Sequence, residues 1–154
     1  GANAALAYSA SHKTNVFAVI ALAPGHFPDR MRAPDIQSKL SESRTKIFSG
    51  QGKATSVFPD INAGEHFEVS GNYLSWYSYF DPNGSANMSR TVTQIKAPLL
   101  LISGTSDPTG RDGKSTIFNR APANQKNRYI EVNAGHFDVP EKASAGIVTW
   151  LSGL

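Results

Sequence analysis

An aspartate and a histidine follow two predicted buried strands, and together they could carry out acid–base chemistry. Asp107 lies in the turn after the apolar residues 99–102, and His136 follows residues 128–132. In an open α/β sheet, ligands bind at the carboxyl ends of the strands, so both side chains are expected to face a cleft. Taken alone, Asp107 is more typical of a turn or helix-capping residue, and His136 of a loop histidine with a surface hydrogen bond.

The two residues are more informative as a pair. Their predicted strands are consecutive, with one predicted helix between them, and neighbouring parallel strands lie roughly 4.8 Å apart. Side chains that leave the carboxyl ends of such strands can therefore meet. An aspartate that accepts a hydrogen bond from one imidazole nitrogen fixes the tautomer and stabilises the imidazolium. The other ring nitrogen can then take a proton from a nucleophile.

The elements that must position this pair alternate between strands and helices. Apolar runs at 16–22, 99–102 and, more weakly, 128–132 predict strands buried on both faces, as in a parallel sheet between helix layers. Helical patterns fall at 3–11, 35–49, 114–119 and 142–151. This order predicts an α/β fold with right-handed crossovers.

The middle of the chain breaks this alternation, because residues 50–95 are too many for a simple connection. We expect an insertion with its own helices, with Ser70 as an N-cap before an aromatic-rich segment at 73–80. The turn sequence at 81–84 closes that segment. The aromatic residues are interpreted as core packing between insertion and sheet, with a substrate-cleft wall as the alternative.

With these residues in view, the sequence resembles the α/β-hydrolases. Residues 100–107 match that family's pattern Leu-Leu-Ile-x-Gly-x-x-Asp, and residues 134–137 match its Ala-Gly-His-Phe pattern. The family's triad runs nucleophile, acid, histidine along the chain. The resemblance implies one partial α/β-hydrolase domain over 1–154, with a cap-like insertion at about 28–95. It also implies hydrolysis of ester or related acyl bonds, with Asp107 orienting His136 as the general base.

The resemblance also implies where the nucleophile lies. Gly1 matches the last glycine of a Gly-x-Ser-x-Gly elbow, and the helix from Asn3 would be the nucleophile helix, whose positive end helps stabilise an oxyanion. The serine would then precede Gly1 by two positions, in an N-terminal half of the same protein. The 154 residues alone are expected to be inactive. The alternative is a non-catalytic fragment or binding module of the same fold.

Other candidate residues were weighed beside this pair. His26 and Phe27 follow the first predicted strand on the cleft side and are candidate contacts for a small-molecule substrate, with a plain loop role as the alternative. Asp112 and Asp138 are reserve acids. The serines near the acid and in the first helix do not lie on a glycine-flanked elbow; they are Ser9, Ser11, Ser103 and Ser106.

Composition limits the remaining classes of function. The chain has no cysteine, which excludes disulfides, thiolate metal sites and a cysteine nucleophile. The formal net charge is +3 with scattered basic residues, a distribution that does not favour nucleic-acid binding. No apolar run approaches the roughly 20 residues of a membrane span. No cofactor is expected, and His26, His66 and His136 lack the compact spacing of a zinc site. The sequence leaves the compartment open.

Overall fold

The computed structural model describes residues 1–12, 15–62 and 65–154, which form two compact units. The first, here called the sheet unit, comprises Gly1–His26 and Met88–Leu154. The second, here called the hairpin unit, comprises Phe27–Asn87. The Asp107–His136 pair lies wholly within the sheet unit, so the site can be described there by itself.

The sheet unit is built on three parallel strands in the order β1-β4-β5. These are β1 (Val19–Leu22), β4 (Leu99–Gly104) and β5 (Arg128–Val132). The central strand, β4, is buried along all six residues, as its uninterrupted apolar sequence requires. The parallel sheet predicted from the three apolar runs is confirmed.

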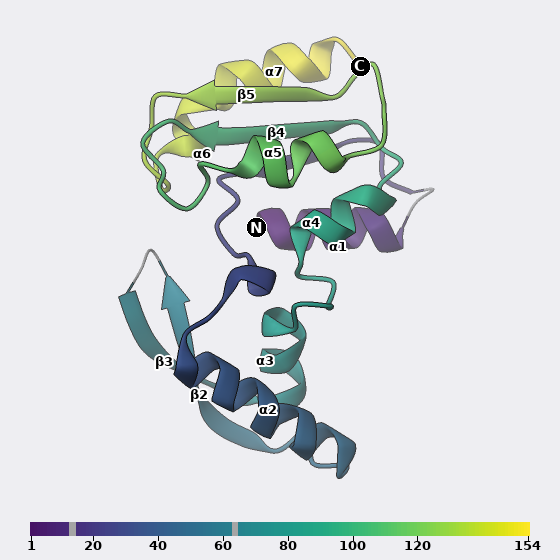
Figure 1. The fold of residues 1–154 in the computed structure, drawn as a ribbon. Coiled ribbons are helices and arrows are strands. Elements are labelled where there is room, and N and C mark those ends of the chain that lie inside the picture. The colour runs from purple at the N-terminus through teal and green to yellow at the C-terminus, as the bar shows by residue number, and fades with distance from the viewer. Residues whose placement is uncertain (13–14, 63–64) are drawn as a thin grey trace. The chain divides into compact units, whose positions relative to one another are not determined.

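Helices cover both faces of this sheet (Figure 1). On one face, Trp150 of α7 packs with Leu100 and Ile102 of β4. On the other, α5 approaches Leu101, since a side-chain carbon on Gly113 would lie 3.7 Å from that leucine. The helical elements of the unit are α1 (Ala2–Ser11), α4 (Met88–Thr91), η2 (Val92–Gln94), α5 (Gly113–Thr116), η3 (Phe118–Arg120), α6 (Val139–Lys142) and α7 (Ser144–Ser152).

Several predicted bounds differ from the observed ones. The first strand was predicted over 16–22 but begins at Val19, and Phe17 before it is 77% exposed. The helix predicted at 114–119 is divided into α5 and η3, because Ile117 leaves the helical region with φ −121° and ψ −65°. The last helix is preceded by the separate turn α6, whose second residue is Pro140. Proline suits a first helical turn because its missing N–H has no partner there.

The hairpin unit contains an antiparallel pair of strands that the sequence pattern did not reveal. Its elements are η1 (Pro28–Arg30), α2 (Pro34–Phe48), β2 (Thr55–Asn62), β3 (Glu65–Asn72) and α3 (Tyr73–Phe80). The expected helices are present, but the two strands beside them were not predicted. β3 is mostly exposed, and β2 contains Pro59, so neither strand shows the apolar alternation that identifies a half-buried strand.

The N-cap of α3 also differs from the prediction. Asn72, not Ser70, caps the helix, and its side-chain oxygen accepts a hydrogen bond from the Ser75 amide at 2.8 Å. Ser70 lies inside β3, paired with Val57. Asparagine is among the preferred N-cap residues because its short side chain reaches the unpaired amides of the first turn.

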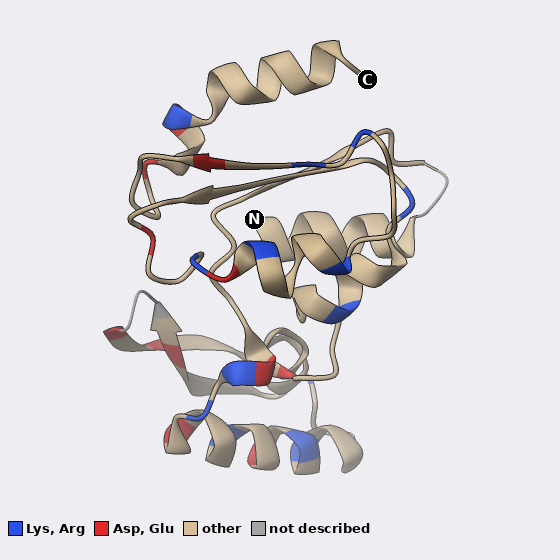
Figure 2. Cartoon of the chain, turned by 45° about the horizontal axis from the view of Figure 1, so that its top comes forward, with Lys and Arg blue, Asp and Glu red and all other residues tan. Residues whose placement is uncertain are grey.

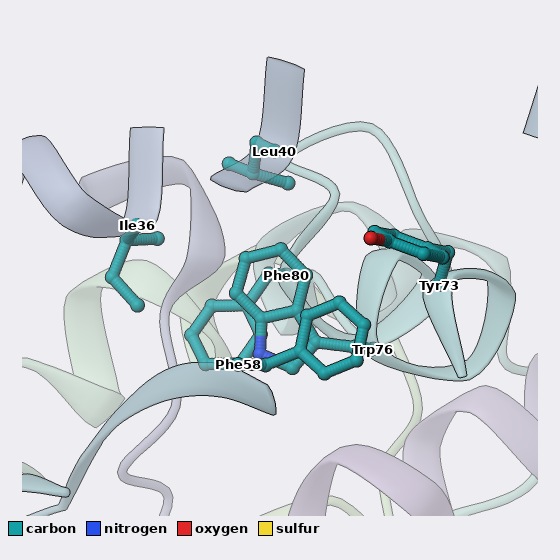
Figure 3. Packing of buried hydrophobic residues seen from close by; sticks show 6 residues of the cluster. All are labelled: Ile36, Leu40, Phe58, Tyr73, Trp76 and Phe80. Carbon is teal, nitrogen blue, oxygen red and sulfur yellow. The ribbon is translucent and has the colours of Figure 1, made fainter. Parts of the chain in front are cut away.

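The aromatic residues of the insertion form the core of the hairpin unit itself (Figure 3). Phe58 of β2 stacks on Trp76, and Trp76 stacks on Phe80 with ring centroids 4.5 Å apart. Tyr73 meets the Phe58 ring edge-on. The interpretation as packing between insertion and sheet is therefore replaced by a core internal to this unit. Its other buried members are Ile36 and Leu40.

Charged side chains are dispersed over many elements in each unit (Figure 2). Within the described residues, no helix is both long and apolar enough to cross a membrane.

Candidate active site

Asp107 and His136 meet at the carboxyl ends of β4 and β5. Nδ1 of His136 lies 2.8 Å from Oδ2 of Asp107, a hydrogen-bonding distance. The Asp107 side chain is fully buried, whereas the His136 side chain is 25% exposed. The histidine therefore links a buried carboxylate to the surface, which is the arrangement that acid–base transfer needs.

Backbone hydrogen bonds hold the two loops together. The amide of Thr105 donates to Val132 O at 2.9 Å, and that of Ser106 donates to Ala134 O at 3.1 Å. Gly104 makes this approach feasible, because a Cβ there would lie 2.3 Å from Ala134 O. At that distance the backbone itself would have to move.

Gly135 is less constrained than Gly104. Its φ is not among the positive glycine values of the described chain. A Cβ on Gly135 would meet Asp138 Oδ2 at 3.5 Å, an ordinary contact. Gly104, at the end of the strand that precedes the acid, is therefore the glycine at which a Cβ would meet backbone of the histidine loop.

Thr109 also belongs to the site, and sequence reasoning missed it. Its amide donates to Asp107 Oδ1 at 2.9 Å and its hydroxyl donates to the same oxygen at 2.6 Å. The Thr109 Oγ1 also lies 3.0 Å from His136 Nδ1. The available signal was the sequence Asp-Pro-Thr, since aspartate commonly accepts a hydrogen bond from the backbone two residues on.

These contacts set the charge state of the buried acid. Burial raises the pKa of Asp107, but hydrogen bonds from the Thr109 hydroxyl, from His136 and from the amides of Thr109 and Gly110 lower it. The donors prevail, and the pKa lies below the ordinary value for aspartate. Asp107 is therefore ionised at neutral pH and able to accept the Nδ1–H of His136.

A pocket of about 470 Å³ lies beside the histidine. Its walls come from the first residues of α1, from β1 and from the histidine loop: Gly1, Ala2, Ile20, Leu22, Ala23, His136, Phe137 and Pro140. Gly1 is the N-cap of α1, so the positive end of that helix borders the pocket. Within the described residues, β1 pairs with β4 alone. The arrangement places a base, a helix N-terminus and a sheet edge around one pocket.

The other predicted residues occupy varied positions. His26 is buried in the sheet unit, and its carbonyl accepts a hydrogen bond from Asn3 Nδ2 at 3.0 Å. Phe27 is the first residue of the hairpin unit, where the Arg30 guanidinium lies 5.1 Å from its ring centroid. The substrate-binding roles of His26 and Phe27 stay predictions.

The reserve acids lie at the N-termini of short helices, and His66 lies outside the sheet unit. Asp112 and Asp138 are exposed and occupy the N-cap positions of α5 and α6. His66 belongs to the hairpin unit, where its ring lies 3.4 Å from Asp35. Over the described ranges, no three His, Asp or Glu side chains gather closely enough to hold a metal ion.

Comparison with known proteins defines the fold. No protein-family model and no curated protein matches the sequence. Among solved structures, the chain is similar to the monoacylglycerol lipase of Paleococcus ferrophilus, with a TM-score of 0.61 and 19% identity over 98% of this chain and 64% of the other. It is also similar to the esterase domain of a Rhodothermus marinus protein, with a TM-score of 0.54 and 16% identity over 99% of this chain and 55% of the other.

A third similar structure is the thioesterase domain from the curacin biosynthetic pathway, with a TM-score of 0.53 and 14% identity over 98% of this chain and 63% of the other. The chain has the α/β-hydrolase fold. It spans between 55% and 64% of the length of these three chains.

Proposed function

We propose that this chain supplies the base and the acid of a serine hydrolase that acts on ester or related acyl bonds. His136 is the general base, and Asp107 orients it. The nucleophilic serine precedes Gly1 by two positions, in the N-terminal half of the same protein. The hairpin unit corresponds to the cap-like insertion, and contacts with a small-molecule substrate are assigned to His26 and, separately, to Phe27.

One observation carries this proposal: the N-terminus of α1 and the ring of His136 line the same pocket. A segment that enters α1 must reach Gly1, which itself lines this pocket. A serine on that turn would be beside the His136 ring, at the positive end of α1. The named activities of the three similar structures, all of which concern ester or thioester bonds, support the acyl substrate class.

The hydrogen bond between Asp107 and His136 supports one path for the proton. Because the Asp107 carboxylate engages Nδ1, the proton-accepting atom of neutral His136 is Nε2. Nε2 takes the serine proton during attack on the acyl carbon and returns it to the leaving group. Asp107 stabilises the imidazolium in between. The positive N-terminal end of α1 helps to stabilise the oxyanion. Water then attacks the acyl-enzyme by the same proton path.

The test uses the polypeptide extended through the residues that precede Gly1. We expect it to hydrolyse p-nitrophenyl acetate and to be labelled by a fluorophosphonate. His136→Ala should lower kcat by roughly 10³-fold or more and abolish labelling. His12→Ala is the matched control, because His12 is exposed at the end of α1 and stacks on Tyr8. It should retain activity.

The 154 residues alone should show no hydrolysis above background. Hydrolysis by these residues that depends on His136 would contradict an upstream nucleophile. An extended polypeptide that folds but is neither labelled nor active would contradict the enzyme assignment. That result would favour the alternative, a non-catalytic binding module of the same fold.

A further inference from the structure

We propose that Thr109 is a positioning residue that locks the Asp107–His136 pair in one hydrogen-bonded state. Its hydroxyl lies between Asp107 Oδ1 and His136 Nδ1. Oδ1 is the carboxylate oxygen that is not hydrogen-bonded to the ring, and Nδ1 is the ring nitrogen that is bonded to Oδ2. The effect on turnover rests on the proposed function, whereas the effect on the pair itself does not.

The groups around the Thr109 hydroxyl determine the direction of each hydrogen bond. A threonine hydroxyl has one proton and two lone pairs. Oγ1 lies 2.6 Å from Asp107 Oδ1, an ionised acceptor that can only accept, so the single proton of Thr109 is directed there. The oxygen then presents a lone pair to His136 Nδ1 at 3.0 Å.

The two acceptors near Nδ1 restrict His136 to one neutral tautomer. Nδ1 faces Asp107 Oδ2 at 2.8 Å and the Thr109 lone pair at 3.0 Å, both of which are acceptors. A ring without a proton on Nδ1 would place three lone pairs against one another in a partly buried site. The neutral ring therefore holds its proton on Nδ1, and Nε2 stays unprotonated. Asp107 and Thr109 act together in this selection.

The same threonine also holds the carboxylate plane. Both donors of Thr109, the amide and the hydroxyl, bind Oδ1, which leaves Oδ2 directed at the ring. Gly25 closes this side of the pair, because a Cβ there would lie 3.2 Å from Thr109 Oγ1 and 2.8 Å from His136 Cε1. The carboxylate and the ring are thus confined by contacts from two separate loops.

The test compares Thr109→Val, which removes the hydroxyl at nearly constant volume, with Thr109→Ser, which keeps it. Thr105→Val is the matched control, because Thr105 lies exposed in the same loop and its hydroxyl is 3.5 Å from Asn133 Oδ1. The first readout is the titration of the Asp107 carboxyl carbon by ¹³C NMR in the 154-residue chain. Thr109→Val should raise its midpoint, and Thr109→Ser and Thr105→Val should leave it near that of the wild type.

The second readout is turnover of p-nitrophenyl acetate by the extended polypeptide. Thr109→Val should lower kcat roughly 10- to 100-fold with little change in KM, because a misplaced base slows the chemical step. Thr109→Ser should restore most of the loss. Thr109→Ala replaces the valine variant if the latter does not give a folded spectrum.

The outcomes separate the two proposals. An Asp107 titration that is the same in Thr109→Val as in the wild type would overturn the role of Thr109. A raised midpoint in an extended polypeptide that has no activity would support the positioning role while the hydrolase proposal fails. A raised midpoint together with a kcat loss that serine rescues supports both.

Discussion

At the residue scale, the stability of a buried ionised group depends on its donors. Asp107 is fully buried, and burial by itself disfavours its charge. Two donors from Thr109 and one from His136 reverse this effect. Their combined action depresses the pKa of the acid and keeps it ionised at neutral pH. The tautomer of neutral His136 is thus set by the Asp107 carboxylate, which is itself held in place by Thr109.

This balance predicts how stability depends on pH in Asp107→Asn. Because the folded-state pKa of Asp107 lies below its unfolded value of roughly 3.9, the ionised group stabilises the fold above about pH 4. That contribution is lost as the pH falls through the folded-state pKa. Asp107→Asn should therefore be less stable than the wild type at pH 7, and the difference should narrow toward pH 3. Urea unfolding of the wild type and of Asp107→Asn at pH 7 and at pH 3 measures the stability difference at each pH.

Asp138→Asn serves as the comparison, because Asp138 is an exposed carboxylate in the neighbouring histidine loop. Its effect on the free energy of unfolding should be small at both pH values. A stability difference between wild type and Asp107→Asn that does not change with pH would contradict the stabilising role of the ionised acid.

At the element scale, the site depends on how closely two loops approach each other. The acid loop after β4 and the histidine loop after β5 share two backbone hydrogen bonds. The last residue of β4, Gly104, lies against the carbonyl of Ala134 with no space for a side chain. The parallel register extends this contact, since Gly104 pairs with Val132 at the end of β5. The distance between acid and base is therefore decided at the strand ends.

Replacement of Gly104 should separate the two loops. In Gly104→Ala, the new Cβ would lie 2.3 Å from Ala134 O, which is backbone and cannot rotate away. The variant should lose about 1–3 kcal/mol of unfolding free energy, the usual range for overpacking. It should also weaken the His136 Nδ1–H signal in ¹H NMR, because the ring moves away from Asp107.

Gly135→Ala is the matched substitution within the histidine loop. Its Cβ would meet Asp138 Oδ2 at an ordinary 3.5 Å, so its stability should stay close to that of the wild type. Denaturant unfolding of both variants tests the comparison. A larger loss in Gly135→Ala than in Gly104→Ala would show that the turn before His136, rather than the strand end, controls the approach.

At the scale of the whole molecule, the described residues form two compact units, and each unit contains a hydrophobic core of its own. The core of the hairpin unit is aromatic and centres on Phe58, Trp76 and Phe80. A core of the sheet unit is formed by β4 with α6 and α7. Since the buried residues named for each core belong to one unit, a cavity made in that core should destabilise that unit first.

Phe58→Ala tests this separation. Phe58 is fully buried and contacts the rings of Tyr73 and Trp76, so its truncation should cost about 3–5 kcal/mol in the hairpin unit. Hydrogen exchange should accelerate in β2, β3 and α3, while the Asp107 titration stays unchanged. Val57→Ala, at a neighbouring half-exposed position, should have little effect. Accelerated exchange in β4 and β5 of the Phe58 variant would contradict the separation.

The sequence by itself determined the parallel sheet and the meeting of Asp107 with His136. Uninterrupted apolar runs must be buried on both faces, and side chains that follow adjacent parallel strands come to one edge. The same patterns missed the β2–β3 hairpin, because exposed strands have no apolar signal and proline argues against a strand.

Only the tertiary structure decided which further residues hold Asp107 and His136 in place. Thr109 is two residues from Asp107, but its contact with His136 exists only after β4 and β5 have paired. The need for glycine at position 104 arises from a carbonyl thirty residues further along the chain, at Ala134. Local patterns record how one segment is buried, whereas contacts between loops depend on the register of the strands that carry them.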